Sequence, residues 1–263
     1  MNIRPLRQSV RPSPVFLAMV AVTVAGGALA WLTPVQPYSR PPVLAYVGVF
    51  TFVIFGWLVS LCLHEFGHAY TAWRYGDRAV EVRGYLTLNP LKYSNPMLSL
   101  GLPVLFIALG GIGFPGGAVY LNTAGMTAAQ KTRVSLAGPL ANAVLAVVLL
   151  TTTALFSDFT HVVFWAALAF LGFLQVTALV LNLIPVPGLD GYSALEPHLS
   201  RELQLKLQPI KRWGLLVFLL LLFIPLFNQW FFGGVMALVG LTGVDEQLVA
   251  WGNALTRFWS AWL

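Results

Sequence analysis

The sequence has few charged residues. Only 9% of its 263 residues are Asp, Glu, Lys or Arg, whereas 58% are hydrophobic, and a soluble domain usually carries about 25% charged residues. Several apolar runs reach the ~20 residues that a helix needs to cross a bilayer, which argues against a soluble protein with an unusually apolar core. We therefore expect one membrane-embedded domain over residues 1–263, since no polar segment is long enough to form a second one.

Cysteine and acidic residues are also scarce. Cys62 is the only cysteine, which excludes an intrachain disulfide and a thiolate-rich metal site, so any metal must be held by His and carboxylate groups. The fifteen basic residues outnumber the nine acidic ones, but they stand in short clusters beside apolar runs. That pattern orients membrane helices in a bilayer and does not indicate a nucleic-acid partner.

The apolar runs predict the membrane spans, at residues 15–32, 42–75, 134–156 and 162–183, with a further block at 213–240. The first run could instead be a signal peptide, although it is long for one. The block at 213–240 contains Pro225 and is either one kinked span or a hairpin. Residues 244–263 predict a C-terminal amphipathic helix, either at the membrane interface or packed against the bundle.

The apolar segment at 97–114 is short and contains Pro103 and several glycines. If it does not cross the membrane, nearly all Lys and Arg residues fall on one side, with Arg40 on the other and Arg257 unassigned. If it crosses, the basic residues divide evenly. Because cytoplasmic loops carry an excess of Lys and Arg, we expect a re-entrant or interfacial segment here, packed on protein, and a cytoplasmic N-terminus.

Residues 80–88 show the alternation and the residue types that favour one or two short strands. The predicted fold is therefore an α-helical polytopic membrane protein. It has five or six transmembrane helices, a small membrane-associated β element and a re-entrant segment.

The chemistry-bearing motif is His64-Glu65-Phe66-Gly67-His68, at the end of the second span. Residues four apart share one helix face, so both imidazoles can bind one tetrahedral zinc ion while Glu65 can reach the water that the metal activates. A pair of satisfied interior histidines with a structural glutamate is the alternative, but ionisable groups within a span are costly and usually functional. We predict one zinc ion per chain, with His64 and His68 as ligands and Glu65 as catalytic base.

A catalytic zinc ion with two His ligands needs a third protein ligand, because water takes the fourth position. Asp190 follows an uncharged span in a stretch broken by Pro and Gly, where free backbone can turn a carboxylate inward. With 97–114 re-entrant, the span ending near Leu183 returns to the side of His64. We therefore predict Asp190 as the third ligand; a carboxylate that caps the loop is the alternative.

Three motifs stand in order within residues 58–191: the one at 64–68, Ala-Gly-Pro-Leu-Ala-Asn at 137–142, and the stretch 182–191 that ends in Leu-Asp-Gly. Together they resemble the site-2 protease family of intramembrane zinc metalloproteases, and specifically its compact members without PDZ or CBS domains. The resemblance implies the same ligands and base, and a catalytic core at about 42–192.

The resemblance also places Asn142 near the site, where it would donate a hydrogen bond to the oxyanion or to the substrate backbone. A hydrogen bond that only packs helices together is the alternative role for Asn142.

The expected function is hydrolysis of peptide bonds within or near transmembrane segments of a membrane-protein substrate, on the cytoplasmic side of the cell membrane. Residues 80–88 or 118–121 could hold the unwound substrate as an added strand. The competing hypothesis is a non-proteolytic membrane zinc-binding protein or carrier. Glu65 argues against it, because a pure binding site needs no base beside its first ligand. The sequence leaves the oligomeric state open.

Overall fold

The computed structural model describes residues 10–35, 40–93, 101, 104–105, 107 and 119–261, and among these the fold is helical, without a strand. Four long helices dominate: α2 (Pro14–Trp31), α3 (Val43–Arg74), α6 (Ala128–Phe156) and α7 (Val162–Leu183). Each is long and apolar enough to cross a membrane. They confirm the predicted membrane character of the chain.

Local sequence signals fix the ends of these helices. Pro42 is the N-cap of α3. At the start of α6, Thr127 and Gln130 form a capping box, in which each side chain bonds the backbone N–H of the other residue. Helix α7 stops at Leu183 because the following residue, Ile184, is extended, as expected for a residue before proline.

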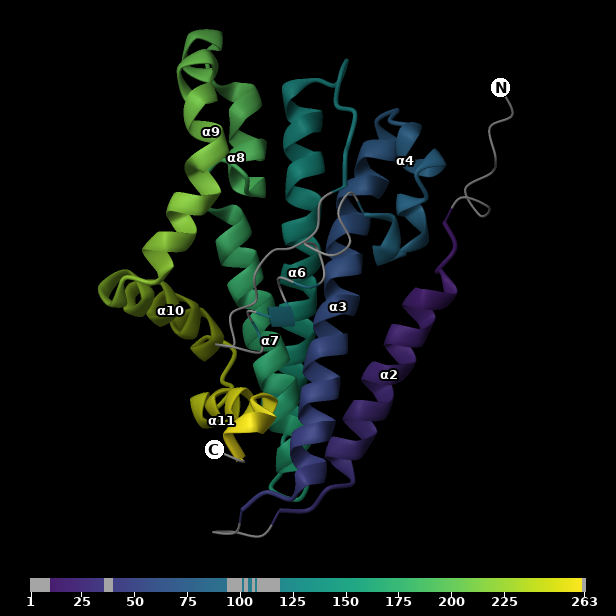
Figure 1. Cartoon of the computed structure of the whole chain (residues 1–263), viewed down its shortest axis with the longest axis vertical. Coiled ribbons are helices and arrows are strands. Elements are labelled where there is room, and N and C mark those ends of the chain that lie inside the picture. Colours follow the sequence, from purple (N-terminus) through teal and green to yellow (C-terminus); the bar gives the residue numbers. More distant parts are fainter. Residues whose placement is uncertain are drawn as a thin grey trace.

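The four long helices alternate in direction along the bundle (Figure 1). Helix α3 ends, and α6 begins, at the end of the bundle that also carries α4 and α8. The segment predicted to be re-entrant, residues 97–114, lies for the most part outside the described residues.

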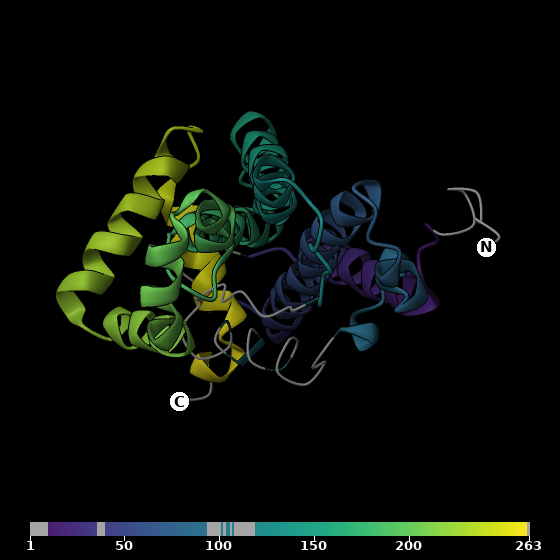
Figure 2. The same cartoon turned by 90° about the horizontal axis from the view of Figure 1, so that it is seen from above.

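Helix α7 is the centre of the bundle. Its most apolar stretch is 83% buried, whereas that of α2 is only 28% buried. Seen from the end of the bundle, α2 and α9 (Arg201–Leu222) lie on opposite flanks with α7 between them (Figure 2). A polar side chain in the middle of α7 is therefore buried within the bundle.

Helices α9 and α10 (Pro225–Gly240) are bent by 90° relative to each other and together could form a fifth span. The bend falls where the sequence analysis placed a break, since Pro225 is the first residue of α10. Proline at this position has no N–H to leave unpaired and starts a helix well.

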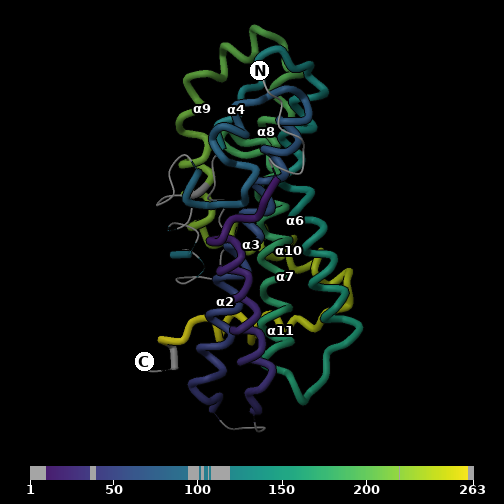
Figure 3. Tube along the Cα trace, turned by 90° about the vertical axis from the view of Figure 1, so that its right-hand side faces the viewer, coloured from purple at the N-terminus to yellow at the C-terminus, as the bar shows by residue number. Residues whose placement is uncertain are grey.

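The C-terminal helices are α11 (Glu246–Thr256) and η5 (Phe258–Ala261). Helix α11 crosses the bundle in the half remote from α8 (Figures 1 and 3). Val249, Gly252 and Leu255 are buried on its inner face, and a Cβ atom at Gly252 would lie 2.1 Å from the Ala166 carbonyl oxygen of α7. Of the two expected positions for this helix, packing against the bundle is the observed one.

The predicted strands at residues 80–88 are wrong. This stretch forms short helical turns, which are α4 (Ala79–Val82) and η1 (Tyr85–Thr87), followed by η2 (Pro90–Lys92). The Asp77 carboxylate accepts a hydrogen bond of 3.0 Å from the Ala79 N–H and starts α4. Gly84, with φ of 75°, then turns the chain into η1. The alternating pattern reflects burial of Val80 and Leu86, and not a pleated strand.

Candidate active site

The side chains predicted to be functional on α3 lie inside the protein. His64, Glu65 and His68 are all buried, although α3 is a candidate membrane span. The two imidazoles share one helix face, and their ring centroids are 4.7 Å apart. Neighbouring helices must therefore satisfy these polar groups, because lipid cannot.

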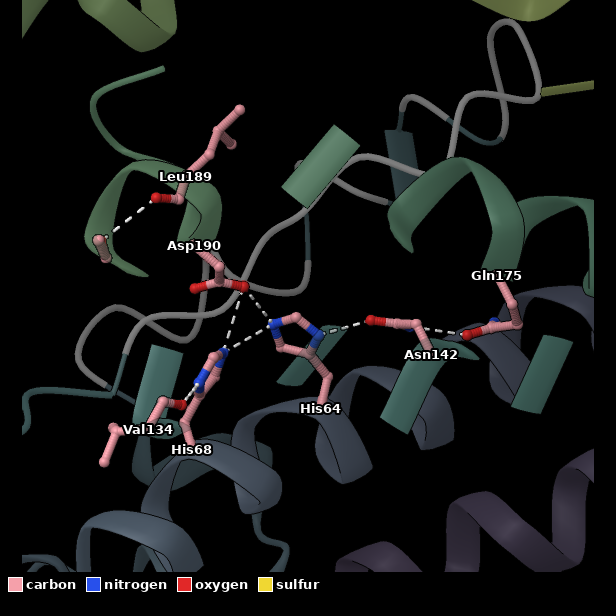
Figure 4. Close-up of polar contacts among 8 residues, drawn as sticks. His64, His68, Val134, Asn142, Gln175, Leu189 and Asp190 are labelled. Carbon is pink, nitrogen blue, oxygen red and sulfur yellow. Dashed lines mark hydrogen bonds and ion pairs between the residues drawn. The ribbon is translucent and has the colours of Figure 1, made fainter. Parts of the chain in front are cut away.

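Asp190 reaches this face from the part of the chain that follows α7. After α7 the backbone turns back at Gly188, whose φ is 101°, and Asp190 is the first residue of α8 (Asp190–Leu195). Its Oδ2 atom lies 3.2 Å from His64 Nε2 and 3.3 Å from His68 Nε2 (Figure 4). The structure thus brings together the three residues that the sequence analysis proposed as metal ligands.

Asp190 is poised to be ionised. Burial alone would raise the pKa of its carboxyl group, whereas positive charge on the His68 and His64 imidazoles, or on a metal ion bound between them, lowers this pKa below its ordinary value. A carboxylate is the form that binds a metal ion.

Hydrogen bonds fix which nitrogen of each imidazole faces Asp190. His68 Nδ1 lies 2.7 Å from the Val134 carbonyl oxygen, which can only accept, so Nδ1 carries the proton. His64 Nδ1 lies 2.5 Å from Asn142 Oδ1 and donates to it. Both Nε2 atoms consequently present lone pairs toward Asp190, as in metal sites whose ligating imidazoles are held through their other nitrogen.

Three acceptor atoms therefore face one another with no hydrogen between them. The two Nε2 atoms are 3.0 Å apart, and Asp190 Oδ2 is buried with no hydrogen-bond partner among the described residues. Such an arrangement is repulsive unless a cation lies between the atoms. Ligands bound to tetrahedral zinc at about 2.0–2.1 Å lie roughly 3.3 Å from one another. The three atoms thus fit a zinc ion in both chemistry and spacing.

Glycines let α6 approach α3 closely enough to complete the site. A Cβ atom at Gly67 would lie 2.7 Å from the Ala137 carbonyl oxygen, and one at Gly138 would lie 2.2 Å from His68 Nε2. The first contact sets the distance between the two helices. The second keeps the space in front of the imidazoles clear.

Glu65 and the metal-ligand cluster open into one cavity of about 870 Å³. Val119 lines the same cavity beside Glu65. Toward α8 and α9 the wall becomes polar, with Lys131, Ser135, Ser193, Glu196 and Gln204. Water and a polypeptide backbone can therefore reach Glu65 although the helix that carries it is apolar.

Asn142 is beside the site, but its amide contacts protein groups. Its Oδ1 atom accepts from His64, and its Nδ2 atom donates to Gln175 Oε1 at 2.8 Å. The sequence analysis missed Gln175 and its partner Ser60. The available signal was an amide side chain within the otherwise apolar run of α7, because polar groups in a span usually have a partner or a function.

Comparison with known proteins places this site in a family. Residues 52–160 match Peptidase family M50. The chain is 68% identical, over 262 residues and the full length of both chains, to a Mycolicibacterium smegmatis protein named as a candidate zinc metalloprotease, Rip2. It is 62% identical to the Rip2 protein of Mycobacterium tuberculosis strain H37Rv, over 97% of each chain.

A more distant relative is similar over a smaller share of the chain. YwhC of Bacillus subtilis, also named as a candidate zinc metalloprotease, is 29% identical over 180 residues, which are 64% of this chain and 78% of YwhC. No solved structure matches the chain. Since full-length relatives and the matched domain agree with the motifs that line the cavity, the chain belongs to Peptidase family M50, the site-2 protease family.

Proposed function

We propose that this protein cleaves peptide bonds within or next to transmembrane segments of membrane-protein substrates, with one zinc ion held by His64, His68 and Asp190. One observation carries the proposal. Three proton-free acceptor atoms, two of them on the candidate membrane span α3, converge beside Glu65 and an open cavity. The full-length relatives named for zinc metalloprotease activity support the same reaction.

Each residue has a distinct role in this reaction. A zinc ion at such a site polarises the scissile carbonyl and lowers the pKa of a water molecule. Glu65 takes the proton from the attacking water and passes it to the leaving amine nitrogen. Asn142, whose oxygen accepts from His64, orients that imidazole. The family resemblance implies in addition a hydrogen bond from Asn142 to the oxyanion or to the substrate backbone.

The extended segment 119–123 is suited to hold an unwound substrate. Val119, Leu121 and Thr123 line the cavity, while Tyr120 and Asn122 are exposed. The Arg83 guanidinium donates to the Tyr120 carbonyl, and the Asn122 N–H donates to Asp77. These contacts anchor one backbone edge of the segment.

The other edge belongs to Leu121, because neighbouring residues of an extended chain point their N–H and C=O groups to opposite sides. No hydrogen bond among the described residues uses the Leu121 backbone. We propose that it pairs with the substrate backbone, whose carbonyls must leave their own helix before attack.

The proposal extends to the placement of the chain in the membrane. The whole chain acts as one domain, with its catalytic core at about 42–192, and spans the cell membrane with five or six helices. The cavity opens to the cytoplasm, because the basic residues beside α3, α4, α6 and α9 mark the cytoplasmic side.

The direct test compares cleavage of purified single-span substrates by the wild type and by Glu65→Gln. The variant should keep its zinc and lose cleavage, because the amide cannot take a proton. Glu246→Gln, at an exposed position of α11, is the matched control and should cleave normally. Equal cleavage by wild type and Glu65→Gln would refute the mechanism. Zinc binding without any cleavage by the wild type would favour the carrier hypothesis.

A further inference from the structure

A buried chain of hydrogen bonds connects three helices and ends on His64. Asn142 Nδ2 donates to Gln175 Oε1 at 2.8 Å, Gln175 Nε2 donates to Ser60 Oγ at 2.9 Å, and Ser60 Oγ donates to the Trp57 carbonyl oxygen at 2.8 Å. Figure 4 shows its first two links, from His64 to Asn142 and from Asn142 to Gln175. Gln175 is completely buried, and Ser60 and Asn142 are nearly so.

The direction of this chain is set at its far end. The Trp57 carbonyl can only accept, so the single hydroxyl hydrogen of Ser60 is used there and Ser60 Oγ can only accept from Gln175. Gln175 must then turn its NH₂ group to Ser60 and its oxygen to Asn142. Asn142 in turn must direct its NH₂ group to Gln175 and its oxygen to His64.

The direction matters because an amide has nearly the same shape after a half turn about its last bond. If Asn142 were turned over, its NH₂ group would face His64 Nδ1, which would then have to accept. The proton of His64 would move to Nε2, and that nitrogen could no longer bind a metal ion. Asn142 alone does not exclude this arrangement; its partners do.

We propose that Gln175 and Ser60 are positioning residues that, through Asn142, hold His64 in its Nδ1–H form and so keep Nε2 free to bind the metal ion. The inference rests on the proposed function for the identity of the metal site. Gln175 is completely buried, so breaking one link leaves buried polar groups without a partner. Loss of the Gln175 side chain therefore affects His64 through Asn142, although Gln175 does not contact His64.

The test is zinc affinity, measured by chelator competition on the purified full-length protein. Loss of an outer partner of a zinc ligand typically weakens binding by 10–100-fold, and Gln175 is one link further away, so Gln175→Leu should weaken binding by about tenfold. Thr177→Val is the matched control. It removes a fully buried hydroxyl from the same helix that bonds only the Phe173 carbonyl, and it should leave zinc affinity unchanged.

A second measurement reports which ring nitrogen of His64 carries the proton. The chain has four histidines, so a protein labelled with ¹⁵N at histidine gives few ring signals. In the zinc-free wild type at mildly alkaline pH, His64 should show a proton on Nδ1 and none on Nε2. Gln175→Leu should diminish that Nδ1–H signal. If this variant does not fold, Ser60→Ala carries the same test with the loss of a single oxygen atom.

A double mutant separates positioning from general loss of packing. In an Asn142→Asp background the group facing His64 is an acceptor in either orientation, so Gln175→Leu should then cost little zinc affinity. An equal loss in both backgrounds would overturn the inference, as would unchanged affinity and an unchanged Nδ1–H signal in the Gln175→Leu single variant. A wild type that shows the Nδ1–H signal and binds zinc but cleaves nothing would instead refute the proposed protease function.

Discussion

The backbone of Gly138 on α6 lies directly against the imidazole of His68 on α3. A Cβ atom at position 138 would stand 2.2 Å from His68 Nε2 and 2.6 Å from His64 Nε2, which is the space in which the ligand atoms converge. Hydrogen-bonded carbonyls and amides elsewhere on α6 hold the other side of both rings. The two imidazole rings are therefore held on both sides and cannot move away from a larger side chain at position 138.

Gly138→Ala should for this reason abolish zinc binding while the helices still form, since alanine favours a helix more than glycine does. Zinc content after purification measures the effect, and we expect less than about a tenth of the wild-type occupancy, at the strong end of the losses known for perturbed ligand shells. Gly233→Ala is the control, because a Cβ atom there would meet nothing within 4 Å. Full zinc content in Gly138→Ala would contradict the proposed position of the metal.

Zinc should also stabilise the folded protein through Asp190. The three acceptor atoms repel one another without a cation, and a ligand present at a hundredfold excess over its Kd adds about 2.7 kcal/mol to the free energy of unfolding. We expect the melting temperature to rise with added zinc in the wild type and to rise far less in Asp190→Asn, which keeps the shape of the side chain but not its charge.

The control for Asp190→Asn is Asp158→Asn, in the loop between α6 and α7 at the opposite end of the bundle (Figure 1). It should show the wild-type response to zinc. An equally large response in Asp190→Asn would show that this carboxylate is not a ligand.

The spans could be predicted because an apolar run is a local feature of the sequence. The ligand cluster could be predicted because few residues of the chain can bind a metal ion. The run predicted at 162–183 coincides with α7, since uninterrupted apolar sequence between a loop and Pro185 leaves little choice of boundary. The pairing of Asp190 with His64 followed from elimination, because few carboxylates are available and the direction of each span decides which side they reach.

The hydrogen-bond partners around the site depend on how each helix is rotated about its axis relative to its neighbours. The hydropathy pattern of the sequence does not contain that information. The partners Asn142, Gln175 and Ser60 come from three helices, and each could have faced elsewhere without changing the hydropathy pattern. The strands predicted at 80–88 failed for a related reason. The hydrogen bond from the Ala79 N–H to the Asp77 carboxylate and the left-handed turn at Gly84 overrode a strand-like pattern of side chains.

Proline at Leu121 tests whether the segment 119–123 holds the substrate backbone. Leu121→Pro removes the N–H group on the edge that we assign to the substrate, so cleavage should fall by roughly tenfold, the equivalent of about one hydrogen bond in the transition state, while zinc content stays normal. Tyr120→Pro removes an N–H group from the opposite edge and should cleave more nearly as the wild type does. Equal losses in both variants would indicate distortion of the segment rather than loss of a substrate contact.

The orientation in the membrane can be tested with one cysteine at each end of the bundle. Cys62 is the only native cysteine and is fully buried, so Cys62→Ala provides a background without thiols. Val82 at the end of α4 is 90% exposed, and Phe159 between α6 and α7 is 98% exposed. Because Arg74, Arg78 and Arg83 accompany α4, we expect that end in the cytoplasm.

In intact cells a membrane-impermeant thiol reagent should therefore label Phe159→Cys and leave Val82→Cys unlabelled until the cells are broken. Both cysteines stand at highly exposed positions, so a difference between them reports the side of the membrane and not burial in the protein. The reverse pattern would place the cavity on the outer face, and with it the polar route by which water reaches Glu65. Labelling of both in intact cells would mean that the loop between α6 and α7 and the end of α4 share one side, which four alternating spans do not allow.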